Sequence, residues 1–61
     1  MALADDLVTQ LVEAKSRDTA WGIVSGRPRA TLEAVADLLY VDPYGMGDNA
    51  LRRAIVREAR A

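Results

Sequence analysis

The chain has 61 residues, no cysteine and no histidine, and a formal net charge of −1 at pH 7. A chain this short forms a single domain, over 1–61, and the missing residue types exclude disulfide bridges, thiolate metal sites and histidine zinc sites. No apolar run approaches the ~20 residues that a membrane-spanning helix needs, and the N-terminal stretch MALADDLV is acidic where a secretory signal peptide is positively charged. We therefore expect a cytoplasmic protein with no membrane partner.

The use of basic and apolar residues is uneven. Seven arginines stand against one lysine, eleven alanines are present, and phenylalanine is absent. This usage is typical of a GC-rich genome, such as that of an actinobacterium or one of its bacteriophages.

The first expected element is an amphipathic helix over residues 3–17. Its opposite face is polar and acidic, and Asp5 and Asp6 in the first turn suit the positive end of the helix dipole. Asp18 would fall on the apolar face, so the pattern predicts that the helix ends or restarts there, with Asp18 or Thr19 as the N-cap. The apolar residues recur at spacings of three and four, as on a buried helix face: Leu3, Leu7, Val8, Leu11, Val12 and Ala14.

A short apolar block follows, over residues 20–24, and ends at Ser25 and Gly26. Either a short helix or a short strand fits this block, and Gly26 suits a left-handed C-terminal position. Trp21 is the one large aromatic residue able to cover a small apolar centre. We expect it to be packed between the helices as the anchor of the core.

The second main helix is expected over about 30–41, after Pro28, with Thr31 as its N-cap. Its outer side carries Glu33 and Asp37 as an acidic stripe. The apolar face is formed by Leu32, Val35, Ala36, Leu38 and Leu39.

The stretch DPYGMGDN then predicts a loop, because it holds proline, two glycines, two aspartates and asparagine. Gly45 and Gly47 precede a helix, as glycines do in phosphate-binding loops. Neither the strand nor the lysine of such a loop accompanies them, so a simple turn is the preferred interpretation.

The third main helix is expected over about 49–60, with Asp48 or Asn49 as its N-cap. Its inward residues are expected to be Leu51, Ala54, Ile55 and Ala59. Arg53, Arg57 and Arg60 recur at i, i+4 and i+7 and form a basic stripe, and Arg52 lies outside this stripe. The sequence therefore predicts an all-α fold, a small bundle of about three helices that associates with another chain.

Catalysis needs a nucleophile with a base, an acid/base pair, or a metal. The remaining candidates are carboxylates, hydroxyls and Lys15, and none of them is convincingly paired. Glu33 and Asp37 share a helix face but have no pocket around them. We expect no enzymatic activity and no cofactor.

Two stretches resemble DNA-binding families. GRPRA, residues 26–30, resembles the start of the DNA-binding domain in Hin-type invertases, and its GRP core is similar to an AT-hook. That resemblance implies an extended arm in an A·T minor groove, with Arg27 and Arg29 inserted. Convergence of Arg53 and Arg57 with them would add phosphate contacts.

The second resemblance is to a helix-turn-helix. The stretch TLEAVADLLYV is similar to the first helix of such a motif, with Ala36 at the position of the small residue. The following loop is about twice the usual turn length. The alternative function is therefore a small DNA-binding regulator with a degenerate helix-turn-helix and a GRPR minor-groove arm.

The main hypothesis is a protein-interaction module, an adaptor or regulator, because a core this small is usually completed by a partner. The partner would be a second copy of the chain, forming a homo-oligomer, or a larger protein. SGRPRA is then a corner between two helices. The partner-binding residues are predicted to be Leu3, Leu7, Leu11, Arg53, Arg57 and Arg60.

Overall fold

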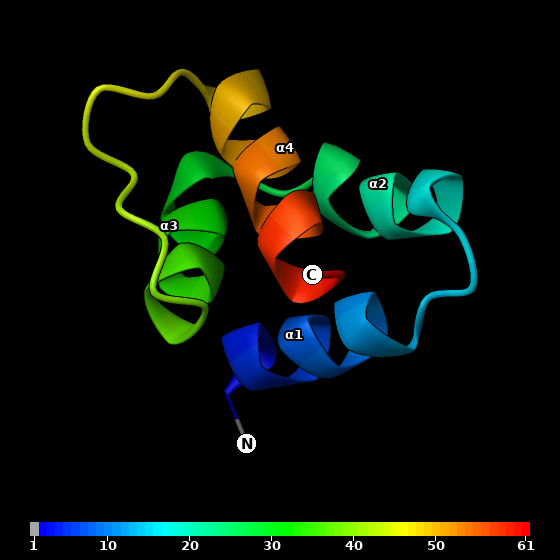
Figure 1. Ribbon diagram of the computed structural model, residues 1–61. Coiled ribbons are helices and arrows are strands. Elements are labelled where there is room, and N and C mark those ends of the chain that lie inside the picture. Colours follow the sequence, from blue (N-terminus) through cyan, green and yellow to red (C-terminus); the bar gives the residue numbers. More distant parts are fainter. Residues whose placement is uncertain (1) are drawn as a thin grey trace.

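The computed structural model describes residues 2–61, which form four helices and no strand (Figure 1). The all-α prediction is confirmed. The segment that the sequence left open between helix and strand forms a helix of its own, so the bundle has one helix more than expected. The helices are α1 (Leu3–Glu13), α2 (Arg17–Ser25), α3 (Arg29–Leu38) and α4 (Asp48–Ala59).

The first helix is shorter than expected because the chain breaks between α1 and α2. α1 ends at Glu13, and Ala14 is already extended with φ −60° and ψ 136°. Ser16 is the N-cap of α2, and its Oγ accepts a hydrogen bond of 3.1 Å from the backbone N–H of Thr19. The predicted caps, Asp18 and Thr19, lie inside the helix instead. Asp18 occupies the first turn, where the helix dipole favours its charge.

The segment SGRPRA is a tight corner between α2 and α3. Gly26 caps α2 with φ −97°, so the left-handed conformation expected for it is wrong. Pro28 is the N-cap of α3, with φ −71° and ψ 163°, and its ring favours this φ. The helix starts at Arg29, so Thr31 lies inside the first turn and is not its cap.

The C-terminus of α3 is closed by a Schellman motif. The N–H of Val41 donates to the carbonyl of Ala36 over 2.8 Å, and the N–H of Tyr40 donates to Asp37 over 3.2 Å. Tyr40 occupies the left-handed position of the motif, with φ 59°, where glycine is the usual residue. The helix consequently ends at Leu38, before the predicted end at residue 41.

α4 begins at Asp48 with Gly47 as its N-cap, so neither Asp48 nor Asn49 caps it as predicted. α4 packs against each of the other three helices, and α1 also packs against α2 and α3 (Figure 1). All four helices contribute to one aliphatic core. Its buried residues are Leu7, Leu11, Ala20, Val24, Leu32, Val35, Ala36, Leu51, Ala54, Ile55 and Val56.

Trp21 does not lie at the centre of this core. It is half-buried and packs against the edge of the cluster, from the outer side of α2. The central volume is filled by fully buried leucines, valines and Ile55. The anchoring role predicted for Trp21 is therefore taken by aliphatic residues, and part of its indole faces solvent.

Candidate binding face on helices α2 and α4

The apolar residues predicted to bind a partner separate into two groups. Leu7 and Leu11 are fully buried in the core of the chain itself, so they are not available to a partner. Leu3 is 51% exposed. Leu7 and Leu11 are buried because α2, α3 and α4 all pack on α1. A bundle without the additional helix α2 would have left part of the apolar face of α1 open.

The arginines of the predicted minor-groove arm lie in the folded corner. Arg29 bonds four acceptors through its guanidinium: Glu33 Oε2 at 3.0 Å, Asp48 Oδ1 at 3.2 Å, and the carbonyls of Met46 at 2.7 Å and Pro43 at 3.2 Å. Its hydrogen bond to Glu33, followed by that to Asp48, raises the pKa of Arg29 above its ordinary value. Arg29 therefore ties the loop between α3 and α4 to the first turn of α3.

Arg27 is half-buried, and its Nε donates to the carbonyl of Ile23 over 3.5 Å. Residues 26–28 join α2 to α3 over a length typical of a helix-turn-helix turn. These two helices pack mainly on α1 and α4, however, and only weakly on each other. The region expected to form the first helix of that motif, α3, is followed by the long connection 39–47.

Arg52 has a role that the sequence did not indicate. Its Nε donates to the carbonyl of Val24 over 3.0 Å, and its Nη2 donates to the carbonyl of Arg27 over 2.9 Å. Its Nη1 bonds Asn49 Oδ1 at 2.9 Å. Arg52 thus adds a donor to the carbonyl of Val24 in the last turn of α2, which also accepts from the backbone N–H of Arg27 over 3.2 Å. Through the carbonyl of Arg27 it also holds the corner between α2 and α3.

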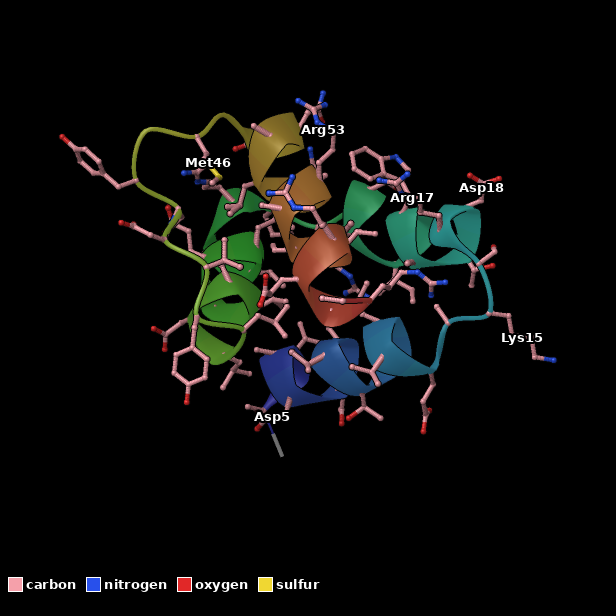
Figure 2. The ribbon with its side chains drawn as sticks, viewed as in Figure 1. Asp5, Lys15, Arg17, Asp18, Met46 and Arg53 are labelled. Carbon is pink, nitrogen blue, oxygen red and sulfur yellow. The ribbon has the colours of Figure 1, made fainter. Side chains whose placement is uncertain are left out.

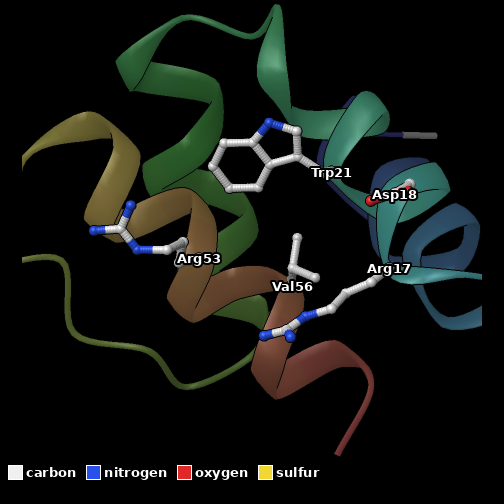
Figure 3. Close-up of a pocket in the computed structure, with 5 residues that line it drawn as sticks. All are labelled: Arg17, Asp18, Trp21, Arg53 and Val56. Atoms are coloured by element: carbon white, nitrogen blue, oxygen red, sulfur yellow. The ribbon is translucent and has the colours of Figure 1, made fainter.

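A shallow depression of about 300 Å³ lies between α2 and α4 (Figure 3). Arg17 and Trp21, one turn apart on α2, form one wall, and Arg53 and Val56 of α4 form the other, with Asp18 also in the lining. A second depression of about 320 Å³ shares Arg17 and Val56 and continues along α4. We call this surface the α2–α4 face; it consists of Arg17, Asp18, Trp21, Arg53, Val56, Arg57 and Arg60.

The α2–α4 face is basic in a protein of net charge −1. Arg17, Arg53 and Arg57 are exposed, and none of them forms a hydrogen bond or ion pair with any residue of 2–61. Arg60 is held by the chain, because its Nη1 donates to the carbonyl of Ala14 over 2.6 Å. Asp18 is the single acidic side chain in the lining of the two depressions, and Ala61 also lines the second one.

The residues of this face can bind an anion that also carries apolar surface. A guanidinium matches the fork of a carboxylate or phosphate, and an indole offers a flat apolar surface with one polar edge. Asp18, the remaining polar group, adds an acceptor. The part of the chain that the structure describes contains no group of three acidic residues arranged to hold a metal ion.

The sequence predicted half of this face. The basic stripe on α4 was expected, but Arg17 was assigned to the first helix and Trp21 to the core. Recognition of Ser16 as an N-cap would have placed Arg17 and Trp21 together at i and i+4 of a new helix. Their position opposite Arg53 depends on how α2 packs on α4, and no local pattern encodes that.

None of the helices in residues 2–61 combines the length and the apolar character that crossing a membrane requires. Comparison of the chain with protein-family models, with curated proteins and with solved structures finds no match. The residues of the α2–α4 face and their chemistry are therefore the basis for assigning a function.

Proposed function

We propose that this protein is a small non-enzymatic interaction module, an adaptor or regulator, whose α2–α4 face binds an acidic segment of a protein. One observation carries the proposal: Arg17 and Arg53 line the depression that holds the half-exposed Trp21, Arg57 lines the adjoining one, and none of the three has a partner within residues 2–61. Elsewhere the chain does pair its arginines, as Arg29 is bonded to Glu33 and Asp48. A set of unpaired guanidiniums around an indole is suited to an external anion.

The charge distribution favours protein carboxylates over nucleic acid. Asp18 lies in the lining, where it can accept a hydrogen bond from a peptide N–H, a donor that a phosphate backbone does not have. The calculated pI is about 5.1, and the outer faces of α1 and α3 carry exposed carboxylates. Nucleic-acid affinity depends mainly on phosphate contacts and on a broad positive surface, which this chain does not have.

Trp21 allows a direct test, because it is the single tryptophan of the chain and lies in the depression itself. A poly-glutamate peptide is titrated into the protein, and tryptophan fluorescence is recorded. We expect a saturable change that weakens as salt rises, because the contacts are between exposed charges. A poly-lysine peptide of equal length should give no such change.

Two matched variants distinguish binding at the α2–α4 face from nonspecific attraction of poly-glutamate to positive charge elsewhere on the protein. Arg53→Gln combined with Arg57→Gln should abolish the response to poly-glutamate, whereas Lys15→Gln should leave it intact. Lys15 is an exposed cation in the α1–α2 connection and lies outside the face (Figure 2). A single-stranded oligodeoxythymidine that binds more tightly than poly-glutamate would contradict the proposal and favour nucleic acid, since stacking on an indole beside arginines also suits unpaired bases.

A further inference from the structure

The outer surface of α1 is the chemical opposite of the α2–α4 face. Asp5, Asp6, Thr9 and Glu13 are exposed there, and Val12 lies among them with 59% of its surface exposed. We call these five residues the α1 face. It combines carboxylates with one apolar side chain, just as the α2–α4 face combines guanidiniums with apolar surface.

The start of the α1 face lies far from the depression around Trp21, and the two faces approach each other where α1 and α4 end, because Val12 and Arg60 line one depression there. Figure 2 shows Asp5 at one end, and Arg17 and Arg53 at the other. Within residues 2–61 the carboxylates of the α1 face form no ion pair with the arginines of the α2–α4 face. The α1 face and the α2–α4 face can therefore each contact a separate molecule.

The spacing of charges on the two faces is the same. Asp6 and Glu13 lie seven residues apart on α1, about 10.5 Å along the helix, and Arg53 of α4 and the C-cap Arg60 are also seven residues apart. Arg60 keeps its bond to Ala14 through Nη1. Two such helices placed side by side bring carboxylates opposite guanidiniums over their common length.

We infer that the acidic segment bound by the α2–α4 face is the α1 face of a second copy of this chain. Asp6 and Glu13 of one copy lie against the arginines of the α2–α4 face in the next copy, and Val12 covers the exposed part of Trp21. This inference rests on the proposed function and names its partner. It follows from the complementary charge and spacing of the two faces.

The contact uses two different surfaces, so an open assembly keeps one unused α1 face at one end and one unused α2–α4 face at the other. Such a head-to-tail contact produces a ring or an open chain of molecules, in contrast to the closed dimer of a two-fold contact. Association should therefore continue beyond the dimer as the protein concentration rises. It should be strongest at low salt, because exposed charges are little screened there.

The test uses two variants, each with one face disabled. The first carries Asp6→Asn and Glu13→Gln, and the second carries Arg53→Gln and Arg57→Gln. All four side chains are exposed, so both variants should retain the helical content of the parent by circular dichroism. Sedimentation velocity at about 0.01 M and about 1 M salt then compares the parent, each variant, and their equimolar mixture.

At low salt we expect the parent to form species larger than a dimer, and each variant alone to be monomeric. The mixture should form a dimer and stop there, because only one intact face of each kind remains. The fluorescence of Trp21 should change on mixing in the variant that keeps its arginines. High salt should abolish all association.

A parent that stays monomeric at low salt overturns this inference, and so does a mixture that fails to associate when the parent does. In either case the poly-glutamate titration still decides the proposed function. A response to poly-glutamate in a monomeric protein would retain the interaction module and assign its partner to another protein. The absence of any response would remove both.

Discussion

Arg52 and Arg53 are neighbours in the sequence and have opposite roles in the structure. Arg52 turns toward α2 and bonds the carbonyls of Val24 and Arg27. Arg53 is exposed beside Trp21 and has no partner within residues 2–61. The comparison shows that a run of arginines is not by itself a binding surface, because the acceptors within reach decide whether a guanidinium serves the fold or remains available to a ligand.

The same division applies to the other arginines. Arg29 and Arg60 bond carbonyls of their own chain, whereas Arg17 and Arg57 do not. The partnered arginines connect segments far apart in the sequence: Arg29 reaches the loop before α4, Arg60 reaches the end of α1, and Arg52 reaches the end of α2. We therefore expect the two groups to respond differently to substitution.

The largest effect is expected at Arg52. Arg52→Ala removes the side-chain donor to the carbonyl of Arg27 and one of the donors to the carbonyl of Val24, and we expect a loss of about 2 kcal/mol in the free energy of unfolding. Urea denaturation followed by far-ultraviolet circular dichroism measures it. Arg53→Ala is the matched control at the adjacent position, and equal losses in the two variants would contradict the division into partnered and available arginines.

A smaller loss in the free energy of unfolding is expected when Arg29 is replaced, because its side chain is partly exposed. Arg29→Ala should release the connection 39–47 and leave the helices intact, so amide hydrogen exchange should accelerate there while the core stays protected. Arg29→Lys should restore little of this protection, because a single ammonium lacks the planar fork that reaches several acceptors at once. Unchanged exchange in this connection would show that Arg29 does not hold it.

Tyr40 extends the comparison to a side chain whose removal should be favourable. It is 97% exposed and has a positive φ of 59°. Tyr40→Gly relieves the unfavourable left-handed conformation, and we expect it to stabilise the fold by about 1 kcal/mol. Thermal unfolding measures the change, and the adjacent Leu39→Gly, with a negative φ of −97°, should destabilise instead.

The smallest effect is expected on the α2–α4 face. Arg53→Gln and Arg57→Gln should together change the stability by no more than about 0.5 kcal/mol, because both side chains are exposed and unpaired. The same variant should lose binding of poly-glutamate. A large loss of stability here would mean that these arginines serve the fold.

The helical class and most of the core could be predicted from the sequence, because apolar spacing on α1, α3 and α4 follows the helical period. The break before α2 was placed too late, since Asp18 and Ser16 are both good caps and only the extended backbone at Ser16 decides between them. Leu7 and Leu11 were assigned to a partner because the covering helices could not be counted from periodicity. The carbonyl acceptors of Arg52 lie 28 and 25 residues away in the sequence and are set by how α2 packs on α4. A local sequence pattern cannot predict contacts at that distance along the chain.

The core of this protein contains no aromatic side chain, and this determines which spectroscopic signals report on it. The chain has one tryptophan, two tyrosines and no phenylalanine; Trp21 is at the surface of α2, and Tyr40 and Tyr44 are 97% and 91% exposed. Intrinsic fluorescence and near-ultraviolet dichroism therefore report on the surface of the molecule. The packing of the interior is visible instead in the methyl resonances of its leucines, valines and single buried isoleucine, so folding and ligand binding can be followed in the same sample by separate signals.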